Sequence, residues 1–174
     1  MRVRDATEAD LPGILTIYNE VIRTSSAVYT DEEATLEDCR AWLVGRTGLG
    51  YPVLVAEDAA DRSVVGYSTF GDFRPWPGYR HTVEHSVYIR FDMRGRGLGG
   101  KLVEPLFARA RGLGKHVMVA GIDAANPVSL RLHERLGFER AGTLREVGAK
   151  FGGWLDLVFM QYFLDPPGLR RPQR

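Results

Sequence analysis

A glycine-rich turn with flanking cations is the part of the chain best suited to bind an anion. The turn, Arg94-Gly95-Arg96-Gly97-Leu98-Gly99-Gly100, lies between a strand-like run at 83–91 and a helix-like run at 101–111. Glycines let the backbone approach a phosphate closely, and a helix start adds free N–H groups and the positive end of its dipole. The two arginines and Lys101 add formal positive charge. The turn therefore predicts a site for a phosphorylated ligand.

Two known phosphate-binding loops match this turn less well. A P-loop requires a hydroxyl residue after its Gly-Lys pair, but Leu102 follows Lys101. Gly95, Gly97 and Gly100 do match the Gly-x-Gly-x-x-Gly fingerprint of a dinucleotide-binding fold. That fingerprint normally opens its domain and is followed by repeated βαβ units, whereas here it lies in the middle of the chain. A dinucleotide-dependent oxidoreductase is thus the weaker alternative.

Composition and charge narrow the class of protein. The 174 residues are 44% hydrophobic and 26% charged, with a formal net charge of +1. Nucleic-acid binders usually carry a larger basic excess, so we expect no nucleic-acid partner. The single cysteine, Cys39, excludes an intramolecular disulfide and a cysteine metal cluster, and we expect no metal. The chain lacks an apolar signal core and any apolar run of about 18 residues, which predicts a cytoplasmic protein that does not enter a membrane.

Apolar periodicity predicts one α/β domain over residues 1–164. Residues 165–174 are expected to be a flexible tail, because Pro166-Pro167-Gly168 ends regular structure. Helices are expected at 7–23, 35–46, 101–111 and 127–136, the first two capped by Thr7 and Thr35. Strands are expected at 2–6, 53–56, 64–70, 83–91, 117–122, 139–147 and 154–164.

Several motifs resemble one enzyme superfamily. Arg94-x-x-Gly97-x-Gly99 is similar to the pyrophosphate-binding motif of the GCN5-related N-acetyltransferases, and Asn126 to Phe138 resembles a second motif of that superfamily. Three further segments resemble the narrower phosphinothricin/methionine sulfoximine acetyltransferase family: Glu84-His85-Ser86-Val87-Tyr88-Ile89, Leu132-His133-Glu134 and Lys150-Phe151-Gly152-Gly153-Trp154-Leu155-Asp156. Ile17-Tyr18-Asn19-Glu20 and Phe73-Arg74-Pro75-Trp76 agree with it too. The resemblance covers residues 2 to about 164.

This resemblance implies a fold and a coenzyme. The fold would be the single-domain acyl-CoA N-acyltransferase fold, a mixed and mostly antiparallel sheet that is splayed at the cofactor strand and flanked by helices. The pyrophosphate of acetyl-CoA would lie on the N–H groups of the glycine turn, and the splayed strand would pair with the pantetheine arm. The implied coenzyme-binding residues are Val87, Tyr88, Ile89, Arg94, Gly95, Arg96, Gly97, Leu98, Gly99, Gly100, Asn126 and Ser129.

The resemblance also implies two catalytic residues. Glu84 matches the family's general base, a role that suits a partly buried carboxylate with a raised pKa. His133 stands where many relatives have a tyrosine that is thought to protonate the departing thiolate, and histidine can donate that proton near neutral pH. A structural salt bridge for Glu84 and a packed helix position for His133 are the alternatives. His81 and His85 are other candidate bases, but neither matches the family pattern.

The acceptor site is implied less directly. Arg74 offers a planar guanidinium for the carboxylate or side-chain oxyanion of an amino acid resembling glutamate, and Pro75 and Trp76 adjoin it. Glu84, Lys150 and Trp154 complete the expected substrate-binding set, and the resemblance implies a homodimer in which a later loop reaches the substrate across the interface. Arg74 and its neighbours would then contact a small-molecule amine.

The reaction implied by the resemblance is acetyl transfer from acetyl-CoA to an amine, by direct attack in a ternary complex. The α-amino group of a small amino-acid analogue, such as phosphinothricin or methionine sulfoximine, is the expected acceptor. A protein N-terminus, a polyamine or an aminoglycoside are alternative acceptors. A coenzyme A-binding module without catalysis is an alternative of another class, although such a module needs neither Glu84 nor His133.

Overall fold

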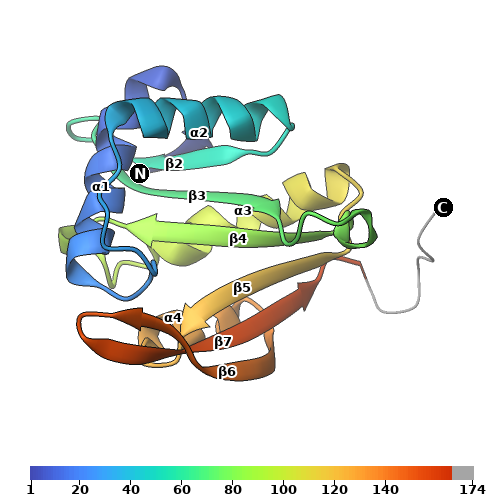
Figure 1. Ribbon diagram of the computed structural model, residues 1–174. Coiled ribbons are helices and arrows are strands. Elements are labelled where there is room, and N and C mark those ends of the chain that lie inside the picture. The colour runs from blue at the N-terminus through green and yellow to red at the C-terminus, as the bar shows by residue number, and fades with distance from the viewer. Residues whose placement is uncertain (166–174) are drawn as a thin grey trace.

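A seven-stranded mixed sheet runs through the centre of the protein, whose computed structural model describes residues 1–165 (Figure 1). In sheet order the strands are β1 (Arg2–Asp5), β2 (Val53–Glu57), β3 (Val64–Asp72), β4 (Thr82–Ile89), β5 (Val117–Asp123), β7 (Gly153–Phe163) and β6 (Glu139–Lys150). Neighbouring strands in this part of the chain are antiparallel, except that β4 and β5 are parallel. The predicted sheet is confirmed, while the predicted tail from residue 166 onward lies outside the described residues.

Helices cover both faces of the sheet. They are α1 (Leu11–Thr24), α2 (Leu36–Gly48), α3 (Leu98–Gly112) and α4 (Pro127–Arg135). Buried apolar residues of α1 and α2, such as Leu11, Ile17 and Leu43, form one cluster with β2 and β3. The buried apolar residues of α3, together with Leu130 of α4, belong to a larger cluster on the opposite face. No helix within residues 1–165 is long and apolar enough to cross a membrane.

Two helix boundaries differ from the prediction for local reasons. The first predicted helix is divided, because Glu8–Asp10 forms a 3₁₀ turn before α1 begins at Leu11. The Asp10 carboxylate accepts hydrogen bonds from the Thr7 N–H and from Arg4, which holds that turn in place. The predicted helix at 101–111 begins earlier, at Leu98, so the last two glycines of the turn lie in its first turn. Thr35 caps α2 as predicted.

The parallel strands β4 and β5 separate after three residue pairs. Within the described chain they pair from Thr82–Val117 to Glu84–Val119, and beyond Glu84 each strand pairs only with its other neighbour. Figure 1 shows β4 and β5 diverging toward their carboxyl ends. The backbone groups of β4 that would face β5 are therefore free for a ligand, as predicted for a sheet that is splayed at this strand.

Candidate functional site

The glycine turn precedes α3 at the carboxyl end of β4. Gly95 and Gly97 have φ angles of 76° and 74°, a left-handed conformation that glycine adopts without steric cost. Both residues are exposed, and a Cβ atom at either would meet open space. Leu98 alone points its side chain into the core, where it is 4% exposed. The turn thus presents its backbone to solvent at the N-terminus of a 15-residue helix.

The two arginines of the turn lie outside the core and bond to nearby backbone. Arg94 donates from Nε to the carbonyl oxygen of Ile89 at 3.1 Å, and its guanidinium stacks over Phe91. Arg96 donates to the carbonyl oxygen of Asp92 at 3.3 Å. Neither forms an ion pair with a carboxylate in the described chain, so both keep their charge available beside the turn.

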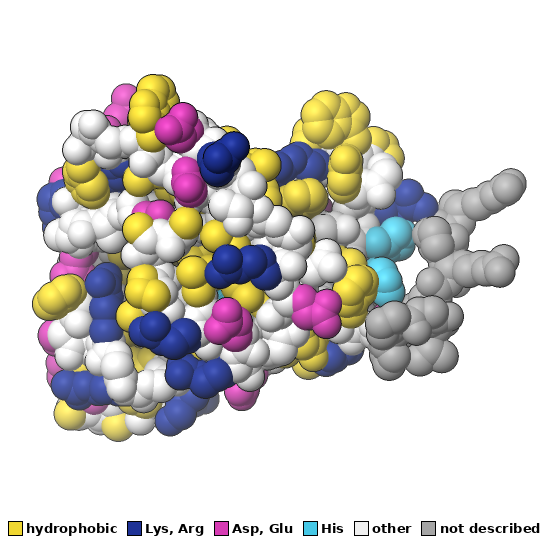
Figure 2. Space-filling view, turned by 90° about the horizontal axis from the view of Figure 1, so that it is seen from below, with side chains coloured by type: hydrophobic (Ala, Val, Ile, Leu, Met, Phe, Trp, Pro, Cys, Tyr) yellow, Lys and Arg dark blue, Asp and Glu magenta, His cyan; other side chains and the backbone are white. Residues whose placement is uncertain are grey.

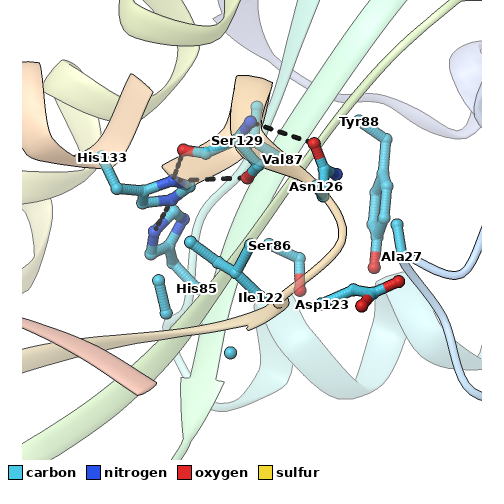
Figure 3. Close-up of a pocket in the computed structure, with 12 residues that line it drawn as sticks. Ala27, His85, Ser86, Val87, Tyr88, Ile122, Asp123, Asn126, Ser129 and His133 are labelled. Carbon is cyan, nitrogen blue, oxygen red and sulfur yellow. Dashed lines mark hydrogen bonds between the residues drawn. The ribbon is translucent and has the colours of Figure 1, made fainter. Parts of the chain in front are cut away.

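A pocket lies in the wedge-shaped opening between β4 and β5, beyond the last residue pair that joins them (Figure 3). Its walls come from β4, from the carboxyl half of β5, from α4 and from the segment between α1 and α2. The lining residues are Ala27, His85, Ser86, Val87, Tyr88, Ala120, Gly121, Ile122, Asp123, Asn126, Ser129 and His133. The structure therefore brings two predicted coenzyme residues of β4, the predicted residues Asn126 and Ser129 at the start of α4, and His133 around one cavity. Ile89 follows them on β4 without lining it. The glycine turn follows β4 in the chain but does not line this cavity.

Asn126 caps α4 at the edge of this wedge pocket. Its Oδ1 accepts a hydrogen bond from the N–H of Ser129 at 3.0 Å. The side-chain nitrogen Nδ2 of Asn126 forms no hydrogen bond with the described residues, and the residue lines the pocket, so Nδ2 can donate to a ligand. Helix capping and ligand binding are therefore compatible at this residue.

His133 is buried between α4 and β4, with both ring nitrogens engaged. Its Nδ1 lies 2.7 Å from the carbonyl oxygen of Ser129, and its Nε2 lies 3.0 Å from Nε2 of His85. Figure 3 shows the two imidazoles beside each other at one end of the pocket. Burial lowers the pKa of His133, although the Ser129 carbonyl partly offsets this, and burial beside His133 lowers the pKa of His85 to about 3.

Glu84 is the last residue of β4 that pairs with β5. Because successive strand residues face opposite sides, its carboxylate lies on the face away from His85. A Cβ atom added to Gly121 of β5 would come within 2.9 Å of Glu84 Oε1, so this glycine makes room for the carboxylate. Burial raises the pKa of Glu84, and the positive charge of Arg74 opposes that shift. The wedge thus begins at a carboxylate that binds its proton more tightly than usual.

A second and larger pocket lies on that other face, beneath α1 and α2. It has a volume of about 410 Å³. Its lining residues are Ile14, Tyr18, Ala34, Asp38, Cys39, Trp42, Arg46, Tyr67, Thr69, Ser86 and Tyr88. Ser86 and Tyr88 also line the wedge pocket, so the two cavities meet across β4. Trp42 and Arg46 were not predicted from the sequence, since nothing in α2 other than its apolar spacing distinguishes them.

The residues predicted to bind substrate lie in two groups. Arg74 stacks over Phe73 and donates to its carbonyl oxygen at 2.8 Å, and its charge acts on Glu84. Pro75 and Trp76 continue the exposed loop after β3. Trp154, at the start of β7, is 72% exposed and lines neither the wedge pocket nor the second pocket. The loop residues other than Arg74 are thus not brought to Glu84 by any contact in the described chain.

Lys150 is buried and holds the segment between α1 and α2. Its Nζ donates to the carbonyl oxygens of Ser25 and Val28, at 2.8 Å each, and burial lowers its pKa. The hydroxyl of Ser26, in the same segment, donates to the carboxylate of Asp123 at the end of β5. These contacts support a role for Lys150 in placing the segment between α1 and α2, whose Ala27 lines the wedge pocket. Its direct contact with a substrate stays a prediction.

Comparisons with known proteins agree with this arrangement. The model of the acetyltransferase (GNAT) family matches residues 14–138. The chain is 53% identical over 164 residues to the L-methionine sulfoximine/L-methionine sulfone acetyltransferase of Pseudomonas aeruginosa, covering 94% of this chain and 95% of that protein. An acetyltransferase structure from Salmonella typhimurium with its cofactor acetyl-CoA has a TM-score of 0.95 and 46% identity, covering 99% of this chain and 98% of that one.

A second solved structure extends the likeness to the narrower family. The phosphinothricin acetyltransferase of Sinorhizobium meliloti, in complex with acetyl-CoA, has a TM-score of 0.94 and 37% identity, covering 99% of this chain and 92% of that one. The family model and both solved structures match the part of the chain that contains β4, the glycine turn and α4. The chain belongs to the GNAT family of acetyltransferases.

Proposed function

We propose that this protein transfers the acetyl group of acetyl-CoA to the α-amino group of a small amino-acid analogue, such as phosphinothricin or methionine sulfoximine. The observation that carries the proposal is the meeting of two pockets across β4, at Ser86 and Tyr88, beside the partly buried Glu84 carboxylate. One pocket lies between β4 and β5, on the strand that leads into the glycine turn, and the other lies beneath α1 and α2. Two substrates can therefore approach the same strand from opposite faces and react directly in a ternary complex.

The wedge pocket and the glycine turn suit coenzyme A. The open, left-handed Gly95 and Gly97 would leave backbone N–H groups for the pyrophosphate, with Arg94 and Arg96 beside them. The unpaired edge of β4 from Val87 to Ile89 would hold the pantetheine arm, together with Asn126 and Ser129. A backbone N–H on this edge of β4 would stabilise the oxyanion, and one such preorganised donor contributes about 3 kcal/mol.

Glu84 would act as the general base. An amine attacks only when it is deprotonated, and a carboxylate with a raised pKa takes up a proton more readily than an exposed one. Burial supplies that shift, and the Arg74 charge limits it so that the carboxylate form remains accessible. His133 lines the wedge pocket on the opposite face of β4. Because its Nδ1 proton bonds to the Ser129 carbonyl and its Nε2 faces His85, a direct proton transfer from His133 to the departing thiolate stays a prediction.

The larger pocket would take the acceptor. Its aromatic walls, Trp42 and Tyr67, suit the aliphatic stem of an amino-acid analogue. Arg46 lines the same cavity and forms no ion pair with a carboxylate in residues 1–165, so its guanidinium can meet an acceptor carboxylate. Arg74 lies toward Glu84 and supplies a second cation. We include a cytoplasmic location in the proposal, since acetyl-CoA is an intracellular metabolite.

Thiol release in the presence of acetyl-CoA and a panel of amines tests the proposal. Methionine sulfoximine and phosphinothricin should be acetylated with kcat/KM at least about a hundredfold above spermidine, an aminoglycoside and a peptide N-terminus, because a site that pairs a carboxylate rejects amines lacking one. A thermal-shift assay with coenzyme A and NADH serves as the control. Stabilisation by NADH alone, or equal rates across the panel, would contradict the assignment.

The glycine turn can be tested with a matched pair of variants. Gly97→Val places a branched side chain at a φ of 74° on the exposed side of the turn, and it should weaken coenzyme A binding by at least about tenfold. Gly114→Val, after α3, has a similar φ of 69° and equally open surroundings, so it carries the backbone strain without touching the turn. Calorimetric titration measures both affinities. Equal affinities in the two variants would remove the phosphate role.

The role of Glu84 predicts opposite effects on activity and stability. Glu84→Gln should lower kcat by roughly 10²–10⁴-fold and abolish the limb of the pH–rate profile on which wild-type activity rises with pH. A carboxyl whose pKa rises on folding stabilises the protein below its unfolded pKa, and that contribution disappears as pH rises through the folded pKa. The variant should therefore be at least as stable as wild type at neutral pH.

Thermal unfolding at several pH values measures the stability, with the exposed Glu104→Gln on α3 as control. A strongly destabilised Glu84→Gln with an unaltered pH–rate profile would assign Glu84 to a structural salt bridge instead. That outcome would leave the proposal for the glycine turn unaffected, because no residue of the turn contacts Glu84 in the described chain.

We also propose that the protein is a homodimer that pairs through the β6–β7 hairpin. In sheet order β6 is an edge strand, and nearly all of its residues are exposed. Large apolar side chains on this hairpin are exposed by 46% to 72%: Leu144, Val147, Phe151 and Trp154. Figure 2 views the molecule from the side of α4 and the hairpin, and hydrophobic side chains alternate there with Lys and Arg. Sedimentation velocity should give a dimer, and Trp154→Glu should shift it toward monomer.

A further inference from the structure

The side chains of His85 and His133 form a buried contact, and the proposed function assigns no role to His85. The two rings belong to different elements, β4 and α4, and their centroids are 5.0 Å apart. His85 is 5% exposed and His133 is 2% exposed, yet both line the wedge pocket. Two imidazoles that face each other beneath a substrate pocket control where protons reside, because each ring can donate at one nitrogen and accept at the other.

The hydrogen bonds fix the arrangement of protons. A carbonyl oxygen only accepts, so His133 must carry a proton on Nδ1, which lies 2.7 Å from the Ser129 carbonyl. A neutral His133 then has a bare Nε2. The 3.0 Å contact holds a single proton, which must lie on Nε2 of His85. His85 is left with a bare Nδ1, and that buried atom has no hydrogen-bond partner among the described residues.

The surroundings keep the pair uncharged. Phe138 contacts both rings, at centroid distances of 5.3 Å from His85 and 5.1 Å from His133. Ser129 contributes its carbonyl on the α4 side. In the described chain no acidic side chain contacts either ring, so a positive charge on one imidazole would be compensated by no carboxylate. Glu84, the nearest acid along β4, lies on the other face of the strand.

We propose that His85 is a positioning residue, which fixes the tautomer and orientation of His133 at the coenzyme side of the wedge. The inference rests on the proposed function, since it gives His133 a place in acetyl transfer. The hydrogen-bonded series runs from β4 through His85 and His133 to the Ser129 carbonyl, and Ser129 itself lines the pocket. Without the His85 donor, His133 has a bare buried nitrogen and is free to turn its ring or change its tautomer.

Two substitutions separate positioning from packing. His85→Gln keeps an N–H donor that can reach Nε2 of His133, whereas His85→Leu has similar bulk and no donor. Nitrogen-15 NMR of the His133 imidazole should show the Nδ1–H tautomer in wild type and His85→Gln and a different protonation pattern in His85→Leu. For turnover, kcat should fall at least about tenfold in His85→Leu with KM for acetyl-CoA within about threefold, and should return to within about threefold of wild type in His85→Gln.

A matched control removes a different histidine. His116→Leu alters a partly buried imidazole that packs against Phe163 and lines neither pocket, and it should leave the His133 spectrum and kcat unchanged. If His85→Leu fails to fold, the wild-type spectrum still shows the tautomer of His133, and His85→Gln still shows whether a donor at position 85 maintains that tautomer and kcat.

Three results would overturn the inference. They are a wild-type His133 protonated on Nε2 alone, a His85→Leu spectrum identical to wild type, and equal impairment of His85→Gln and His85→Leu with the His133 tautomer unchanged. Failure of the proposed function is distinguishable, because an absence of acetyl transfer in wild type leaves the NMR comparison intact.

Discussion

The separation of β4 from β5 beyond Glu84 is the constraint on which the rest of the site depends. A parallel pair normally satisfies its backbone along its whole length, and unpaired groups inside a protein are costly. Here β3 pairs with β4, and β7 pairs with β5, to the end of each strand, so both strands remain part of the sheet beyond the point where they separate. The opening gives one strand a free polar edge, and α4 and the glycine turn lie where a polar ligand along that edge would reach them.

The same strand also divides the chemistry between two faces. With a period of two, Glu84 and Ser86 face α1 and α2, while His85 and Val87 face α3 and α4. Glu84, the proposed base for the amine, and His85, which positions His133, can therefore be sequence neighbours without contacting each other. The arrangement has an energetic cost, because Glu84 is held partly buried with a raised pKa rather than paired closely with Arg74.

Local signals in the sequence were sufficient for the parts of the site that depend on local structure. The conformation of Gly97 and the caps at Thr35 and Asn126 follow from neighbouring residues, and each was predictable. Long-range contacts were not. Nothing near Lys150 in the sequence indicates that its ammonium would be buried against residues more than 120 positions away, nor does α4 indicate that His133 would meet His85. Such contacts depend on how β6, α1 and β4 pack in three dimensions.

Glycines illustrate the same division between local and long-range causes. Gly95 and Gly97 adopt a left-handed backbone conformation that favours glycine, so a sequence motif is enough to predict them. Gly99 serves packing instead, because a Cβ atom there would come within 2.7 Å of the Cδ2 methyl of Leu132 on α4, and that side chain would have to move. A residue of the phosphate motif thus also makes room for a side chain of α4, a long-range contact that the motif itself does not indicate.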